Sequence, residues 1–444
     1  MPSIWDAIVV GAGPAGCLVA ERLVARGHSV LLLDGGPRPH PGQKVSEVDR
    51  RLWAFTTRGG AFDWYRVRAV GGRTLLWGGW FYRMPEAALR RGGWPYAART
   101  LAPIYRELER KLGVVDGMVD DRYARMARRL GVRILPKRAP LVGDRAWTAL
   151  DLPIAKKART HVVALRLEHS RHAATTLTCH DLRDDRVKQL RARAFVLAAS
   201  PIETARILLE SELGRGGASI GKNLVDHIVA SYVLIEPKPA PSPAGRGRFP
   251  GSALVESFVH AEATSAPTYP GGFSIELSGP FPLASLGVER MVTSDDVERS
   301  SATLIHALGE SFPTPKRFVD LDDTTRDVLG RRVPRIHVAW SAADRRMTRD
   351  MERACANLAD ALAVPGSRLI PLVRAPSAGA GHEAGTCVMG RDDDAPCDPW
   401  GKLRLLNNVW IADASVLPTA SDRHPTATVL AHALRAADAV ASRL

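Results

Sequence analysis

Long apolar runs are missing from this chain of 444 residues. No stretch reaches the roughly 18–20 residues that a membrane-spanning helix requires, which excludes a transmembrane helix. The first buried strand is expected to begin at about Trp5, which leaves no room for the basic segment and apolar core of a signal peptide. We therefore expect a cytoplasmic protein with no membrane partner.

Cysteine is also scarce. The five cysteines are an odd number, which argues against a disulfide framework, and none stand at the paired spacing of a metal site. Cys387 is open to two interpretations, a redox thiol or a small apolar filler near a strand, and we favour the filler. The pair His382–Glu383 and the run Asp392–Asp394 could suggest a metal. However, the aspartates lack the spaced oxygen partners of a calcium loop, so we expect none.

Blocks of like charge are absent, although the chain has a net charge of +14 and an isoelectric point near 10.0. The arginines are scattered in short pairs, and aromatic residues do not alternate with them in a pattern that would stack nucleic acid bases. We interpret the excess charge as a solvated surface and expect no nucleic acid partner. A positive field would still favour anionic cofactors and substrates.

The chain opens with a strand, a glycine-rich turn and a helix. The apolar run Trp5–Val10 leads into Gly11-Ala-Gly13-Pro-Ala-Gly16, and the following pattern predicts a helix over 17–26 and a strand over 29–33. In such a β-α-β unit the first glycine makes a tight turn and the second admits a pyrophosphate, while the third lets the helix pack on the strand. The helix N-terminus then faces the phosphates.

Asp34 stands at the end of the second predicted strand. A carboxylate there can accept hydrogen bonds from ribose hydroxyl groups. Because the glycine motif lies between a strand and a helix with this acid in place, a dinucleotide site is favoured over a structural turn. The motif alone does not distinguish FAD from NAD.

The rest of the chain predicts strands mixed with helices. Helices are expected from Trp94-Pro95 onward and over 202–209, 345–362 and 428–441. Strands are expected over 161–167, 173–179 and 187–190 as a meander, and over 194–199, 253–260, 272–277, 303–308, 335–340 and 409–412. The Pro-rich stretch 236–251 is a connector or a mobile flap, and we favour the connector.

Four further motifs follow the glycine-rich turn, at Gly71–Gly79, Gly93–Tyr105, Phe195–Leu209 and Ile220–His227. In this order the motifs resemble the glucose–methanol–choline (GMC) family of flavin-dependent alcohol oxidoreductases, with most likeness to its sugar-oxidising, pyranose oxidase-like branch. The first is similar to the stretch that runs beside the flavin, and the second to the opening helix of the substrate domain. The resemblance implies FAD as the cofactor.

The resemblance also implies an α/β fold with a Rossmann-like FAD-binding domain assembled from discontinuous segments and an α+β substrate domain with an antiparallel sheet. The FAD-binding domain would comprise residues 1–80, 158–235 and 376–444, and the substrate domain residues 81–157 and 236–375. The chain is shorter than many relatives, so a trimmed substrate domain is expected, with room for a bulky glycoside.

Two positions depart from the family pattern. Ser200 replaces a usual glycine, which would tighten the approach of the backbone to the cofactor. Leu76 stands where some sugar-oxidising relatives attach FAD covalently through a histidine. Because leucine offers no nucleophile, we expect non-covalent FAD.

The resemblance implies cofactor contacts at several further positions. Asp413 and Ala414 should lie near the ribityl–pyrophosphate region, and Val162 should contact the adenine through its backbone. The expected cofactor-binding residues are Gly11, Gly13, Gly16, Asp34, Gly72, Thr74, Trp77, Gly78, Val162, Ala199, Ser200, Asp413, Ala414, Pro425 and Thr426.

Two histidines near the end of the chain stand on separate supports, His382 in His-Glu-Ala-Gly-Thr and His424 in His-Pro-Thr. The resemblance maps His382 onto the catalytic histidine of the family and His424 onto the position beside it. A neutral imidazole suits removal of a hydroxyl proton, and a second one can hold the hydroxyl oxygen. Proline early in the final helix would direct its positive end at the flavin. We expect His227 to be structural and the remaining histidines to lie at the surface.

These observations predict the FAD-dependent oxidation of an alcohol to a carbonyl group, with a sugar, polyol, glycoside or natural-product intermediate as substrate. Two alternatives stay open: a non-redox lyase on the same scaffold, and a nucleotide-binding protein without catalysis. Oxygen or another electron acceptor is equally compatible with the sequence.

Overall fold

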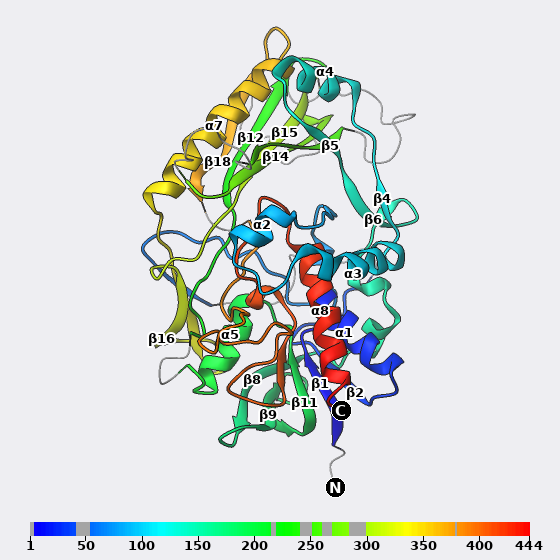
Figure 1. Ribbon diagram of the computed structural model, residues 1–444, viewed down its shortest axis with the longest axis vertical. Helices are drawn as coiled ribbons and strands as arrows, with labels where there is room; N and C mark the ends of the chain where they lie inside the picture. Colours follow the sequence, from blue (N-terminus) through cyan, green and yellow to red (C-terminus); the bar gives the residue numbers. More distant parts are fainter. Residues whose placement is uncertain are drawn as a thin grey trace.

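The computed structural model describes residues 4–40, 54–214, 219–239, 251–259, 269–283, 299–377 and 380–444. Figure 1 shows two lobes. One holds a parallel sheet with helices α1 (Pro14–Ala25) and α8 (Thr426–Ala441), and the other an antiparallel sheet with helix α7 (Ala342–Leu362). This arrangement confirms the expected α/β fold class. Most of the Pro-rich stretch 236–251 lies outside the described residues.

The parallel sheet has the strand order β2-β1-β11-β19. Its first unit is the predicted β-α-β unit, formed by β1 (Trp5–Val10), α1 and β2 (Val30–Leu33). Helix α1 begins at Pro14, earlier than predicted, because proline suits the first helical turn, where an N–H group has no partner within the helix.

Segments far apart in the sequence complete this lobe. β11 (Ala192–Leu197) lies between β1 and β19 (Val409–Ile411), and it leads into helix α5 (Pro201–Glu210). Helix α8 packs beside α1, so the end of the chain lies against its beginning (Figure 1). The strands are short, apolar and buried, as parallel strands covered by helices require.

A three-stranded antiparallel sheet adjoins the parallel sheet, and its strands follow the predicted meander. They are β8 (Val162–His169), β9 (Ala174–Asp181) and β10 (Arg186–Leu190). A bridge between Leu33 and Arg159 connects β2 to the segment that enters the meander. Leu167, Leu177 and residues of the parallel sheet belong to one hydrophobic core.

The second lobe is built on a six-stranded antiparallel sheet. Its strands, in order, are β18 (Arg368–Ser377), β12 (Ile228–Glu236), β15 (Ser301–Gly309), β14 (Gly272–Pro282), β13 (Ser252–Val259) and β5 (Ile134–Pro136). The sequence predicted β13, β14 and β15 but not the other three. β12 places residues 228–235 in this sheet, although we expected them in the FAD-binding segment 158–235.

Smaller elements connect the lobes. Helices α2 (Glu86–Arg91), α3 (Ala98–Lys111) and α4 (Asp121–Leu130) precede the meander. Short sheets are formed by β3 (Thr56–Arg58), β17 (Arg332–His337) and β16 (Phe318–Arg326), and by β4 (Val114–Asp116), β6 (Arg138–Val142) and β7 (Arg145–Ala146). α7 begins three residues before its predicted start because Ser341 and Asp344 form a capping box at its N-terminus.

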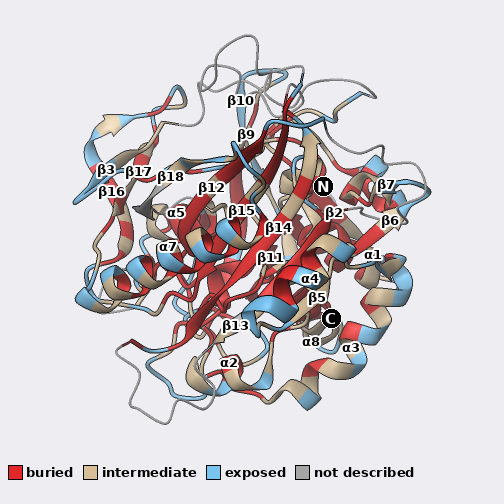
Figure 2. Ribbon diagram, turned by 90° about the horizontal axis from the view of Figure 1, so that it is seen from above, coloured by how far each residue is buried: buried red, intermediate tan, exposed pale blue. Residues whose placement is uncertain are grey.

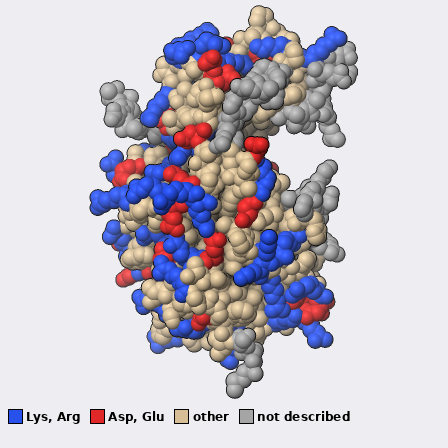
Figure 3. Space-filling model, turned by 90° about the vertical axis from the view of Figure 1, so that its right-hand side faces the viewer, with Lys and Arg blue, Asp and Glu red and all other residues tan. Residues whose placement is uncertain are grey.

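Burial is most continuous in the central strands of the two sheets, among them β11, β12 and β14, whereas the edge strand β5 is only partly buried (Figure 2). On the face drawn in Figure 3, lysine and arginine are interspersed with aspartate and glutamate. Within the described part of the chain, no helix is both long and apolar enough to cross a bilayer.

Candidate active site

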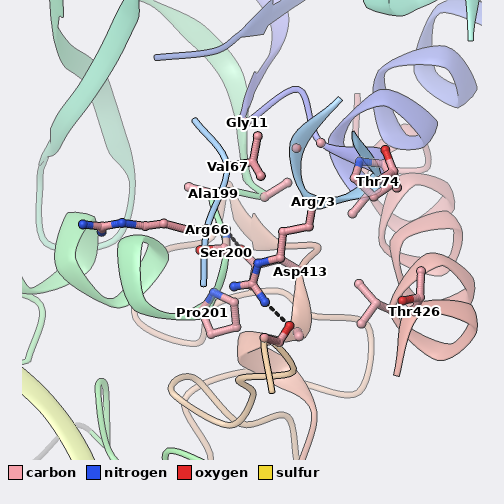
Figure 4. A pocket seen from close by; sticks show the side chains of 18 of the residues that line it. Gly11, Arg66, Val67, Arg73, Thr74, Ala199, Ser200, Pro201, Asp413 and Thr426 are labelled. Atoms are coloured by element: carbon pink, nitrogen blue, oxygen red, sulfur yellow. Dashed lines mark hydrogen bonds between the residues drawn. The ribbon is translucent and has the colours of Figure 1, made fainter. Parts of the chain in front are cut away.

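A cavity of about 490 Å³ lies between the lobes, where the carboxyl ends of β1, β2 and β11 meet β14 and β15. Nucleotide ligands bind at this end of parallel strands, and the volume falls within the range of ~300–1,000 Å³ of small-molecule sites. Residues from distant segments line it together (Figure 4). Of the predicted site residues, all but Gly16 line this cavity: Gly11, Gly13, Asp34, Gly72, Thr74, Trp77, Gly78, Val162, Ala199, Ser200, His382, Asp413, Ala414, His424, Pro425 and Thr426.

The three glycines of the first turn have different surroundings. A Cβ atom on Gly11, whose φ is +100°, would lie 2.3 Å from the carbonyl oxygen of Ala198. A Cβ atom on Gly16 would lie 1.9 Å from the carbonyl oxygen of Gly11. Gly16 therefore allows helix α1 to pack closely against the turn that follows β1. At Gly13, the N-cap of α1, no protein atom stands within 4 Å of that position. The open space at the helix N-terminus suits an anionic group.

Asp34 is held in place by two backbone groups. Its Oδ2 atom accepts the N–H of Ala12 at 2.9 Å, and Oδ1 accepts the N–H of Gly36 at 2.8 Å. Burial raises the pKa of Asp34, and these two bonds oppose the rise. Each carboxylate oxygen has a further lone pair available to a hydroxyl group in the cavity.

Ser200 adopts a backbone conformation that glycine prefers, with φ +79° and ψ 156°. Its N–H donates to Oδ2 of Asp413 at 3.0 Å, and the hydroxyl of Thr204 donates to the same oxygen at 2.6 Å. The N–H of Ser415 donates to Oδ1 of Asp413 at 2.9 Å. The carboxylate of Asp413 therefore joins α5 to the 3₁₀ helix Ala414–Val416, a positioning role that we had not expected.

The glycine-rich stretch passes close to the first turn as a 3₁₀ helix, Gly72–Leu75. A Cβ atom on Gly72 would lie 3.1 Å from Cα of Gly13. Thr74 accepts the N–H of Ala149 at 3.0 Å, and the indole N–H of Trp77 donates to the carbonyl of Trp147 at 2.9 Å. Leu76 lines the cavity and offers it an apolar surface.

One detail restricts the expected adenine contact of Val162, which stays a prediction, and another corrects the expected start of the final helix. The N–H of Val162 donates to the carbonyl of Asp34 at 2.9 Å, so a backbone contact with an adenine could come only from its own carbonyl. Helix α8 begins at Thr426 with Pro425 as its N-cap, before the predicted start and with the proline outside the first turn. The positive end of α8 therefore faces the cavity.

The two predicted catalytic histidines meet at the cavity wall. The ring centroids of His382 and His424 are 4.8 Å apart, and the rings are nearly perpendicular, at 82°. Trp80 stacks on His424 with a centroid distance of 5.8 Å. Burial lowers the pKa of both histidines well below the ordinary value, and neighbouring imidazoles lower it further. Both rings are therefore neutral near pH 7, as a base or a hydroxyl ligand requires.

The histidine predictions were incomplete. His227 belongs to this cluster, because its Nδ1 atom lies 2.8 Å from Nδ1 of His382. His306 and His432 were expected at the surface, yet His306 lines the cavity and His432 is buried against the carbonyl of Ile411 at 3.1 Å. Burial lowers the pKa of each of these three histidines to about 4, so they are neutral residues of the interior.

Glu276 is a second residue that sequence reasoning missed. Its Oε1 atom lies 2.9 Å from Nδ1 of His424, although the two groups are poorly aligned for a hydrogen bond. Burial raises the pKa of Glu276 to about 8, and Lys137 opposes the rise. The available signal was a single acid inside an apolar strand, and His306 gave the same signal on the neighbouring strand.

Arg73, within the glycine-rich stretch, forms an ion pair with Glu383 in the cavity wall and donates to the carbonyl of Gly381. The described residues also contain a group that could hold a metal ion, formed by Asp226, His227 and His382, with ligand atoms within 4.8 Å of one another. Asp226 accepts the backbone N–H groups of both histidines, at 2.7 and 3.2 Å. The absence of a metal remains a prediction.

A glycine turn at the carboxyl ends of a parallel sheet, sharing its cavity with paired imidazoles, defines a Rossmann-like nucleotide-dependent enzyme. Residues 143–229 and 313–433 match two models described as GMC oxidoreductase, and residues 9–64 match an NAD(P)-binding Rossmann-like domain. The chain belongs to the GMC oxidoreductase family, as its motifs predicted.

Relatives in sequence agree with this assignment, and a solved structure has a similar fold. The chain is 26% identical to paromamine 6'-oxidase of Streptomyces fradiae, over 99% of this chain and 92% of that one. It is 34% identical to pyranose 2-oxidase of Tricholoma matsutake over 34% of this chain and 25% of that one. Pyridoxine 4-oxidase from Mesorbium loti has a similar fold, with a TM-score of 0.72 and 21% identity over 98% and 99% of the two chains.

FAD is the cofactor of the GMC oxidoreductases and therefore of this chain. The cavity residues fit it. The space over Gly13 accommodates a pyrophosphate, and the remaining lone pairs of Asp34 suit ribose hydroxyl groups. The positive end of α8 faces the same cavity near the histidines, where it suits the polar edge of a flavin.

Proposed function

We propose that this enzyme oxidises a hydroxyl group of a small molecule to a carbonyl group, with His382 as the base. The observation that supports this most directly is the pair of neutral imidazoles, His382 and His424, 4.8 Å apart in the wall of a cavity that also contains the nucleotide-binding turn.

Oxidation of an alcohol removes a proton from oxygen and a hydride from carbon, leaving a carbonyl group. The bound FAD supplies the hydride acceptor. His382 accepts the hydroxyl proton, a role that contributes ~10²–10⁴-fold to the rate in other enzymes. His424 holds the hydroxyl oxygen, so that the C–H bond is directed at the cofactor. The N-terminus of α8 stabilises negative charge that develops at its end of the cavity.

A sugar, a polyol, a glycoside or a natural-product intermediate is the proposed substrate class. Two relatives are named paromamine 6'-oxidase and pyranose 2-oxidase, and these names give paromamine and a pyranose as the compounds that those proteins oxidise. Glu276, Trp80 and His306 give the cavity wall both polar and aromatic groups, a combination that suits a sugar ring. Oxygen or another acceptor reoxidises the cofactor. We place the enzyme in the cytoplasm, which agrees with five cysteines that are all free thiols.

One anaerobic experiment separates this function from its alternatives. A panel of sugars, polyols and amino sugars is added to the holoenzyme, and the visible absorption of the flavin is followed. Loss of absorption on addition of one alcohol, with the carbonyl product identified by mass spectrometry, is the expected result. Turnover without loss of absorption would instead indicate a lyase. If the full panel produces no turnover and no loss of absorption, the protein binds the nucleotide without catalysis. Repeating the assay in air distinguishes an oxidase from a dehydrogenase.

The mode of FAD attachment has its own test. Leu76 carries no nucleophile at the position where a covalent bond would form, so we propose that FAD is held non-covalently. After acid precipitation all flavin should remain in the supernatant. Flavin that stays with the precipitated polypeptide would overturn this.

A further inference from the structure

His227 joins the supports of the two active-site histidines without lining the cavity itself. The residue is fully buried and immediately precedes β12. Its Nδ1 atom is hydrogen-bonded to Nδ1 of His382 at 2.8 Å, and its Nε2 atom to the carbonyl oxygen of Ser421. Ser421 stands three positions before His424. One buried ring therefore contacts both segments that carry the reacting groups.

These two hydrogen bonds have a fixed direction. A backbone carbonyl oxygen can only accept, so the bond to Ser421 requires a hydrogen on Nε2 of His227. In a neutral imidazole the other nitrogen then carries a lone pair. Nδ1 of His227 is thus an acceptor, and the hydrogen between the two rings must belong to Nδ1 of His382.

The argument depends on His227 being neutral, and its surroundings support that state. The ring is fully buried, and its two nitrogens face a carbonyl oxygen and another imidazole, so neither nitrogen has an anionic partner there that would stabilise a positive charge. Asp226 accepts the backbone N–H of His227 at 2.7 Å, so the adjacent carboxyl group holds the main chain. A charged His227 would donate through both nitrogens and would force the hydrogen of His382 onto Nε2.

We infer that His227 is a positioning residue that keeps the hydrogen of His382 on Nδ1 and leaves Nε2 free to accept the substrate proton. The inference rests on the proposed function, because it assigns an atom to the base. In the reaction the hydroxyl proton moves to Nε2 of His382, and the hydride leaves the same substrate carbon for the cofactor. The resulting imidazolium keeps its Nδ1–H bond to His227, which is stronger when the donor is charged.

Kinetics of two variants test the inference. His227→Phe removes the acceptor while filling similar space, and kcat should fall between about 10-fold and 100-fold, as when hydrogen-bond partners of metal-bound histidines are removed. KM should change little, because His227 lies outside the cavity lining. His227→Asn retains an oxygen near the position of Nδ1, so it should restore much of kcat. Wild-type kcat and an unchanged pH profile in His227→Phe would overturn the inference.

A spectroscopic measurement on the wild-type holoenzyme does not depend on variant folding or on turnover. In ¹⁵N-histidine-labelled protein, long-range ¹H–¹⁵N correlations distinguish the two neutral tautomers. The expected result is Nδ1–H for His382 and Nε2–H for His227, with His382→Ala and His227→Asn used to assign the signals. A hydrogen on Nε2 of His382 would overturn the inference even if alcohol oxidation is observed. The expected tautomers without any alcohol oxidation would instead contradict the proposed function.

Discussion

Nδ1 of His424 lies 2.9 Å from Oε1 of Glu276, and only one of the two facing atoms can carry a hydrogen at that distance. Burial raises the pKa of Glu276 to about 8. Below that pH the carboxyl group is uncharged, so the hydrogen of His424 can lie on Nε2 and be donated to the substrate oxygen. Above it the negative charge of the carboxylate attracts the hydrogen of His424 to the facing Nδ1 atom, even without an aligned hydrogen bond, and Nε2 loses its donor.

We therefore predict that kcat declines as the pH rises through about 8. Glu276→Gln has no ionisable group and should abolish this alkaline decline. Glu310→Gln is a matched control, because burial raises the pKa of Glu310 to about 7, but the residue pairs with Arg91 outside the cavity lining. An alkaline decline that persists in Glu276→Gln, measured across the same pH series, would contradict the assignment.

Removal of the base should affect chemistry far more than binding. His382→Ala is expected to slow anaerobic flavin reduction by ~10²–10⁴-fold, the usual contribution of a general base. His432→Gln is the control, because His432 is buried but lies outside the cavity lining, where its side chain bonds the carbonyl of Ile411. Stopped-flow reduction at wild-type rate in His382→Ala would show that another group accepts the proton.

The glycines of the first turn should separate folding from cofactor binding. Gly13→Ala adds a methyl group where no protein atom lies within 4 Å, so the variant should fold but bind FAD weakly. Gly16→Ala places Cβ 1.9 Å from the carbonyl of Gly11 and should destabilise the fold itself. Circular dichroism and the flavin-to-protein ratio measure the two effects. If Gly13→Ala retains full FAD affinity, the pyrophosphate lies elsewhere.

Ser200 offers a stability test. Its φ of +79° and ψ of 156° lie in a region that costs non-glycine residues about 1–3 kcal/mol, while a glycine adds about 0.5–1 kcal/mol of chain entropy cost. Ser200→Gly should therefore raise the free energy of unfolding by about 1 kcal/mol. Asn223→Gly is the comparison, because Asn223 has φ +61°, which asparagine tolerates, and it should change stability less. Denaturant titration that shows lower stability for Ser200→Gly would contradict the strain argument.

Much of the fold was predictable because its signals are local. The glycine turn, Asp34 and the buried run at 194–199 each require neighbouring residues only, and the structure has β1, α1, β2 and β11 at these positions. The strands β5, β12 and β18 were not predicted, since their apolar residues have a partner only after distant segments pair.

Several active-site residues could not be predicted from the sequence for the same reason. Nothing in the pattern around Asp226-His227 indicates that the ring of His227 touches His382, which lies more than a hundred positions away. Glu276 and His306 were detectable only as polar residues inside apolar strands. Their meeting with His424 depends on how the two lobes pack.

The sequence by itself determined the nucleotide-binding turn, the GMC membership and the two histidines, because glycine conformation and motif order are properties of short segments. The tertiary structure decided how these histidines are supported. It placed His227 against His382 and Glu276 against His424. It also placed the carbonyl oxygen of Ser421 against the second ring nitrogen of His227. The direction of a hydrogen bond depends on which atom lies opposite, and that is fixed only when both ends of the chain reach the same cavity.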